Sequence, residues 1–192
     1  MDTELFTWHT HSDTLADLKY GLGLAQNSGA KSILVLTCHK NQYCEEELSS
    51  LFRTYSLLLF GGAFPMLTFQ NQLLNRGAII IGFNDALDII SFSDLHLHSN
   101  EENLEAFIAT TLEETNNLEN NDNFLMFYDA SVSHFESFID CLFEYLDHAI
   151  DIIGGGAGNV DFSSKACIYT NQGIHSNAAI LVALPKKLHT GI

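Results

Sequence analysis

The sequence predicts a mixed α/β fold in which sheets are flanked by helices. Short apolar runs, many of them bounded by glycine or polar residues, alternate with longer segments whose apolar side chains recur at helical spacing. The chain has 192 residues, of which 46% are hydrophobic, so it carries enough apolar surface for one substantial core. We therefore expect residues 1–192 to form a single domain.

The first part of the chain predicts alternating strands and helices. Residues 4–10 (ELFTWHT) predict a first strand, and residues 12–29 predict a helix because their apolar side chains recur at helical spacing. The apolar run SILVLTC at 32–38 is typical of a buried strand. Residues 44–55 predict a helix with one apolar face, and LLLFGG at 57–62 predicts the next strand and its turn.

The middle of the chain predicts a hairpin followed by a strand and a helix. The runs TFQNQLL (68–74) and GAIIIGF (77–83) flank Asn75-Arg76-Gly77, so we expect them to pair across that turn. Residues 85–93 predict a further strand, and residues 101–118 predict a helix with one apolar side.

The last part of the chain repeats this mixture. FLMFYD (124–129) predicts a buried strand, and apolar spacing predicts a helix over 132–148. IDII at 150–153 predicts a strand that runs into a glycine loop. Residues 166–173 and 177–185 predict two closing strands.

These elements recur in the same order twice. SILVLTC, a helix, LLLFGGAF, TFQNQLL and GAIIIGF form one series, and NFLMFYD, a helix, DIIGGGAG, ACIYTNQG and NAAILVAL form the other. We interpret this order as a pseudo-twofold duplication of a strand–helix–strand–strand–strand unit, with approximate boundaries 32–97 and 123–186. Chance similarity between α/β segments is the alternative interpretation.

Composition narrows the range of partners. The formal net charge is −16, from 24 acidic and 8 basic residues, which argues against nucleic acid and anionic membrane surfaces because both require clustered Lys and Arg. No run approaches the ~20 apolar residues of a membrane-spanning helix, and the N-terminus lacks the pattern of a signal peptide. We therefore expect a cytoplasmic protein whose four scattered cysteines stay reduced.

Two glycine-rich segments, FGGAFPML (60–67) and IIGGGAGN (152–159), are the candidate ligand site. Neither continues as Gly-Lys-Ser/Thr or as GxGxxG before a helix, so a nucleotide phosphate site is not expected. Glycine lets backbone N–H groups approach a ligand, and if the halves are symmetric the two loops face each other. A purely structural turn is the alternative. The predicted ligand-binding residues are Gly61, Gly62, Phe64, Gly155, Gly156, Gly158, Asn159 and Asn171.

The residues predict no catalytic constellation and no metal site. There is no GxSxG elbow, and the two His-x-His pairs supply too few ligands for zinc. A hydrolase or transferase that uses the glycine loop as an oxyanion site stays open as an alternative, as does a purely structural interaction module.

The order LVLTC, helix, LLLFGGAFP, GAIIIGF, then FLMFYD, helix, DIIGGGAGN, YTNQG, AAILVAL resembles the N-terminal domain of FIST proteins. The resemblance covers nearly the whole chain, and its most specific part is IIGGGAGN followed by Gln172-Gly173 and a final apolar strand. It implies an intracellular sensory module that binds small ligands such as amino acids and passes a signal to attached or partner proteins.

The resemblance also implies an alternative ligand and further partners. Some family members are haem-binding nitric-oxide sensors that control histidine kinases. Haem needs one axial histidine and an apolar pocket, and His39, His134 and His175 each follow or flank a predicted strand end. The family usually carries a C-terminal FIST domain as well. Because the sequence ends at LPKKLHTGI, we expect that domain to be absent from this chain.

Overall fold

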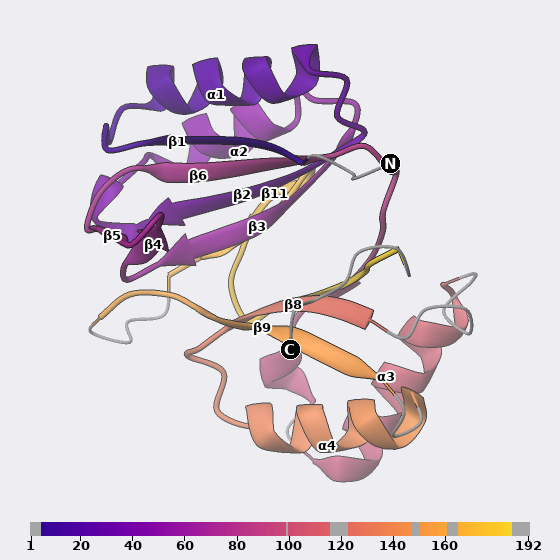
Figure 1. Cartoon of the computed structure of the whole chain (residues 1–192). Coiled ribbons are helices and arrows are strands. Elements are labelled where there is room, and N and C mark those ends of the chain that lie inside the picture. The colour runs from indigo at the N-terminus through magenta and orange to yellow at the C-terminus, as the bar shows by residue number, and fades with distance from the viewer. Residues whose placement is uncertain (1–4, 99, 116–122, 147–149, 161–164, 186–192) are drawn as a thin grey trace.

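The structure is a computed structural model that describes residues 5–98, 100–115, 123–146, 150–160 and 165–185. These residues form four layers, in which two sheets lie between two layers of helices (Figure 1). This arrangement confirms the mixed α/β class. No helix in these ranges is long and apolar enough to cross a membrane. The helical elements are α1 (Leu15–Asn27), η1 (His39–Asn41), α2 (Glu45–Phe52), η2 (Leu95–Leu97), α3 (Glu101–Glu113) and α4 (Phe135–Leu146).

The larger sheet has six strands and lies under α1 and α2 (Figure 1). Strands β2 and β3 are parallel, and every other neighbouring pair is antiparallel. In spatial order the strands are β1 (Phe6–Thr10), β6 (Ala78–Phe83), β2 (Ser32–Cys38), β3 (Leu58–Phe64), β10 (Ile168–Thr170) and β11 (Gly173–His175).

The smaller sheet has four strands and is covered by α3 and α4 (Figure 1). Strands β8 and β9 are parallel, whereas β12 is antiparallel to both of its neighbours. In spatial order the strands are β7 (Asp88–Phe92), β12 (Ala179–Ala183), β8 (Asn123–Asp129) and β9 (Asp151–Ala157). A separate hairpin consists of β4 (Leu67–Phe69) and β5 (Gln72–Leu74).

Both halves of the chain follow the same path. Residues 6–83 run strand, helix, strand, helix, strand, hairpin, strand, and residues 88–183 repeat that order. The pairing matches except at the hairpins, because β10 pairs with β3 whereas β4–β5 forms a separate sheet. The register corresponds as well, because Gly61 pairs with Val35 as Gly154 pairs with Met126. The shared path begins one strand and one helix before each predicted repeat. Duplication with boundaries 32–97 and 123–186 stays a prediction.

The predicted hairpin over Asn75-Arg76-Gly77 is wrong. Strand β4 pairs with β5 instead, and the turn between them is Gln70-Asn71. Both turn residues have positive φ, 47° and 63°, which is the backbone that a tight two-residue hairpin turn requires. Strand β6 lies between β1 and β2. The run at 166–173 is predicted as one strand. In the structure it contains β10, a turn and the first residue of β11, which together with β10 forms a second hairpin.

The apolar side chains form two main clusters. One fills the space between the two sheets and the space under α1 and α2, with Phe52, Phe60 and Val182 fully buried. The other lies between the smaller sheet and its helices and includes Phe92 and Phe138, whose rings meet edge to face. The sheets are therefore fixed to each other by a shared core.

Candidate functional site

The two glycine-rich segments are strands, so their prediction as loops is wrong. Gly61 lies inside β3 and Gly154 inside β9. Gly61 has a φ of +145°, and a Cβ there would lie 2.0 Å from the Val35 carbonyl oxygen. A Cβ on Gly154 would lie 1.7 Å from the Met126 carbonyl oxygen. Both glycines are needed because a neighbouring strand passes too close for any side chain.

The structure brings the two glycine segments together. The Gly158 N–H donates to the Ala63 carbonyl at 2.7 Å. A Cβ on Gly62 would lie 3.1 Å from the Cβ of Ala157. The Phe64 ring meets the ring of Phe127 edge to face, with centroids 5.6 Å apart. The segments therefore touch directly, through a hydrogen bond and apolar packing.

The two predicted asparagines are buried or held by the backbone. Asn159 is 5% exposed. The Asn171 side chain accepts from the Leu59 N–H at 2.8 Å and donates to the carbonyls of Tyr55 and Leu57 at 3.0 and 2.9 Å. These bonds tie the β10–β11 hairpin to the beginning of β3. They account for the polar capacity of this side chain without a ligand.

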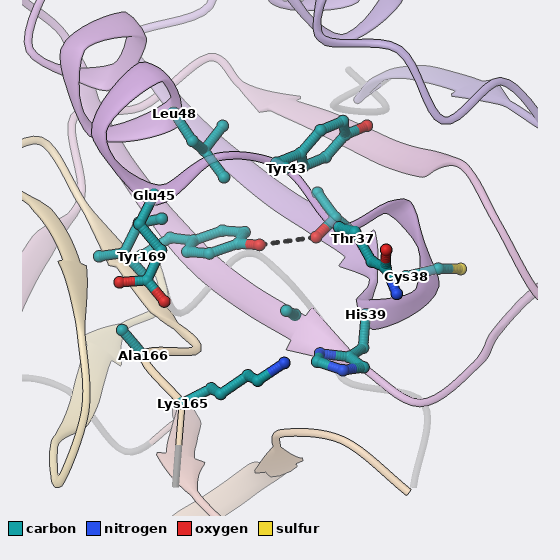
Figure 2. Close-up of a pocket in the computed structure, with 12 residues that line it drawn as sticks. Thr37, Cys38, His39, Tyr43, Glu45, Leu48, Lys165, Ala166 and Tyr169 are labelled. Carbon is teal, nitrogen blue, oxygen red and sulfur yellow. Dashed lines mark hydrogen bonds between the residues drawn. The ribbon is translucent and has the colours of Figure 1, made fainter. Parts of the chain in front are cut away.

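A cavity of about 420 Å³ lies on the α2 side of the larger sheet, where β2 and β3 end (Figure 2). The beginning of α2 and the β10–β11 hairpin complete its walls. The carboxyl ends of parallel strands are a common place for ligands. The residues that line the cavity are Thr37, Cys38, His39, Gln42, Tyr43, Glu45, Leu48, Ala63, Lys165, Ala166, Tyr169 and Ile174.

Of the residues predicted from the sequence, only His39 lines this cavity. The eight predicted ligand-binding residues lie around it or farther away, and their role in binding stays a prediction. The cavity is nevertheless next to them, because Ala63 lies between Gly62 and Phe64 on β3. Sequence reasoning missed Glu45, because acidic residues at the start of a helix are explained by the helix dipole alone. It missed Tyr169 because nothing in the pattern shows that the hairpin crosses to β3.

The cavity carries opposite charges on different walls. Figure 2 shows the ammonium end of Lys165 pointing toward the His39 ring, whereas the Glu45 carboxylate lies on the side of Ala166 and Tyr169. Within the described residues no ion pair joins Lys165 to Glu45. A ligand in the cavity therefore meets a cationic group and an anionic group at separate points.

Neutral polar groups form another part of the wall. The Thr37 and Tyr169 hydroxyls hydrogen-bond at 2.7 Å, and burial raises the pKa of Tyr169 well above its usual value. The Cys38 thiol donates to the Leu74 carbonyl at 3.3 Å, and burial raises its pKa too. Both groups stay protonated at neutral pH, whereas an activated nucleophile has a lowered pKa.

The three histidines considered for haem lie apart. His39 lies in η1 at the cavity, and His134 is exposed just before α4, where its carbonyl accepts from the Phe138 N–H. His175 lies in β11, where its Nε2 is 2.8 Å from the Thr170 hydroxyl. Burial, with the nearby Arg53 charge, lowers the pKa of His175. Within the described ranges, no three His, Cys, Asp or Glu side chains are placed to hold a metal ion.

The FIST N domain family model matches residues 89–192, which is more than half of the chain. The chain therefore belongs to the FIST N domain family, a family of sensory domains in signal transduction. The matched region contains β9 and the β10–β11 hairpin, and it supplies Lys165 and Tyr169 to the cavity. Among curated proteins, none matches the chain.

Proposed function

We propose that this domain is a cytoplasmic sensor of a small zwitterionic metabolite, such as an amino acid, and that the cavity beside His39 is its ligand site. The observation that carries the proposal is the separation of Lys165 from Glu45 within one cavity of about 420 Å³. That volume falls in the range of small-molecule sites.

The ligand's two charges fit these walls. A carboxylate bound beside Lys165 and His39 gains charge-assisted hydrogen bonds, and an ammonium group beside Glu45 gains another. Leu48 and Ile174 supply apolar surface for a side chain. The protonated Thr37 and Tyr169 pair adds a neutral polar contact.

The cavity also suggests how binding becomes a signal. Its walls come from both halves of the chain, since Thr37 and Glu45 precede β3 whereas Lys165 and Tyr169 follow β9. A ligand that bridges them favours the state in which the halves are closest, and it shifts the population toward that state. A histidine kinase, another signalling protein or a C-terminal FIST domain then responds to the shift.

The haem and hydrolase alternatives have less support. Haem needs an apolar pocket, whereas the wall around His39 carries Lys165 and Glu45. An oxyanion site at the glycine segment needs a nearby nucleophile, yet a Cβ on Gly156 would lie closest to atoms of Ala130 and Tyr128. We therefore favour a metabolite over haem and binding over catalysis.

The test is a thermal-shift screen of the amino acids, followed by calorimetric titration of each hit. A ligand of the native state raises the melting temperature. The variants Lys165→Met and Glu45→Gln each weaken binding about tenfold, because each removes one charge-assisted hydrogen bond. Lys165 and Glu45 are exposed, so both variants keep the fold.

Controls distinguish the site from general charge effects. Lys40→Met and Glu47→Gln change the same charges on exposed residues that do not line the cavity, and they leave affinity unchanged. Haem is added separately and followed by its Soret absorption. If every amino acid fails to shift the melting temperature, or if Lys165→Met binds as tightly as the unaltered chain, the cavity is not the sensor site.

A further inference from the structure

Among the residues that the structure describes, none pairs with the outer edge of β9, whereas the corresponding edge of β3 is paired. In the described part of the chain β9 is the end strand of the smaller sheet, with β8 on its inner side. Its counterpart β3 has β2 on one side and β10 on the other. The equivalent strands therefore differ in the backbone hydrogen bonds that β10 makes with β3.

The hydrogen bonds of β3 show which amide groups of β9 point outward. On β3, the N–H groups of Leu59 and Ala63 donate to Asn171 and to the Cys167 carbonyl, away from β2. Alternate residues of a strand share this direction. The register places Ile152, Gly154 and Gly156 of β9 at the positions of Leu59, Gly61 and Ala63. These three N–H groups therefore point away from β8.

Little side-chain bulk obstructs that edge. Gly154 is exposed, and a Cβ added to Gly155 would meet no atom within 4 Å. Asp151, at the beginning of the strand, is exposed and anionic. An uncovered strand edge with outward N–H groups is a template for another strand.

We propose that the β9 edge binds an extended, basic segment of a partner protein, which adds to the sheet as an antiparallel strand. The pairing of β10 with β3 is the geometric template, with Ile168 opposite Gly62 and Thr170 opposite Phe60. The same register on β9 places the incoming strand opposite Gly155 and Ile153. This surface is separate from the cavity and does not depend on what the cavity binds.

Charge and packing indicate which strand can occupy the β9 edge. A second copy of the chain carries the same net charge of −16, so two copies repel each other, whereas a strand with Lys or Arg is attracted. The chain's own β4–β5 hairpin is held elsewhere, because Leu67 and Leu74 are buried in a cluster with Cys38 and Ile79. Of the occupants compared, a basic strand from another protein fits the β9 edge best.

The test uses a synthetic peptide with the sequence of residues 166–175, with Ser in place of Cys167 and two lysines added at each end. Residues 168–170 of this segment already pair with the equivalent edge of β3. Binding to the full chain is followed by fluorescence anisotropy, and amide exchange is followed by NMR. We expect binding that weakens with salt and slower exchange of the Ile152, Gly154 and Gly156 amides.

The edge is blocked with Ile152→Pro, which removes an outward N–H at a position where edge strands tolerate proline. Ile152→Ala is the matched control, because it loses the side chain but keeps the N–H. Ile152→Pro binds the peptide about tenfold more weakly than Ile152→Ala. Circular dichroism of both variants confirms that they are folded.

Four results would overturn the proposal. They are no binding at millimolar peptide, equal binding by the two Ile152 variants, equal binding of a peptide whose added lysines are replaced by glutamates, and a dimer of the unaltered chain that Ile152→Pro converts to a monomer. The last result would assign the edge to a second copy.

Discussion

The two halves of this domain share a path and a register but differ at the edge of their third strands. In the first half, β3 is covered by the β10–β11 hairpin, and the covered edge helps to enclose a cavity. In the second half, β9 has no such cover in the described residues. The position of one hairpin, rather than the strand order, therefore decides which of the two parallel strand pairs borders the cavity beside His39.

The ends of the first parallel strands differ in the same way. Cys38 ends β2 at the cavity, and the register places Asp129 at the corresponding end of β8. Asp129 is 1% exposed and accepts from the Ser131 N–H, the Ser131 hydroxyl and the Asn177 N–H at 2.7–2.9 Å. A filled hydrogen-bond network therefore takes the place that the cavity has in the first half.

The largest expected effect comes from replacing a glycine of β3. Gly61→Ala destabilises the domain by about 4 kcal/mol, because the positive φ is strained and the methyl group meets the Val35 carbonyl. Gly155→Ala changes stability by less than about 1 kcal/mol, because its added methyl group meets open space. Urea unfolding measures both. Equal effects would show that neither the positive φ of Gly61 nor the nearby Val35 carbonyl strains the Gly61→Ala variant.

The next largest loss of stability is expected when the carboxylate at the end of β8 is removed. Asp129→Ala lowers the free energy of unfolding by about 3 kcal/mol, because three hydrogen-bond donors lose their acceptor. The variant Cys38→Ala, at the corresponding position, lowers the free energy of unfolding by about 1 kcal/mol, since it loses one small buried thiol and its weak hydrogen bond to the Leu74 carbonyl. The comparison is made by thermal unfolding. A larger loss for Cys38→Ala would contradict the assignment of the network to the second half.

A smaller loss of stability is expected when the β10–β11 hairpin is less firmly attached to β3. Asn171→Ala costs about 2 kcal/mol because it removes three hydrogen bonds to the segment that begins β3. Gln172→Ala is the control, since that side chain is exposed and the bond from Arg53 goes to its backbone carbonyl. Denaturant midpoints measure the difference. Equal midpoints would mean that pairing alone holds the hairpin.

The smallest expected effect depends on pH. Because burial lowers the pKa of His175, the unfolded chain binds a proton below about pH 6.5 that the folded chain resists. His175 therefore lowers stability as pH falls through that value and has no such effect above it. His175→Gln reduces the fall in melting temperature between pH 7 and pH 5. An unchanged pH profile would indicate that His175 titrates normally in the folded state.

Sequence patterns predicted the elements whose signals are local. The strand 32–38 and the helix 44–55 correspond to β2 and α2, because apolar periodicity reports the buried face of each. The two hairpins were harder to predict, because each of their strands has only three residues and therefore shows little periodicity. The turn at Gln70-Asn71 depends on two positive φ angles, which neither residue type requires.

The site was predicted less completely than the fold, for a physical reason. The sequence singled out the glycine segments as a ligand site. Gly61 cannot be replaced without a clash, but the cause is the neighbouring strand that lies against it. Lys165 and Tyr169 reach the cavity only because the hairpin crosses from one half to the other. That crossing is a long-range pairing, and no local pattern in the hairpin sequence encodes its destination.

The crossing of β10–β11 also has a consequence for cooperativity. Because the hairpin leaves its own half to pair with β3, the first half does not complete its six-stranded sheet without the second. Separately expressed fragments, cut between Phe83 and Asp88, would each expose a face of the shared core and would fold only as a complementing pair. We therefore expect the domain to unfold as one cooperative unit, despite its bipartite architecture.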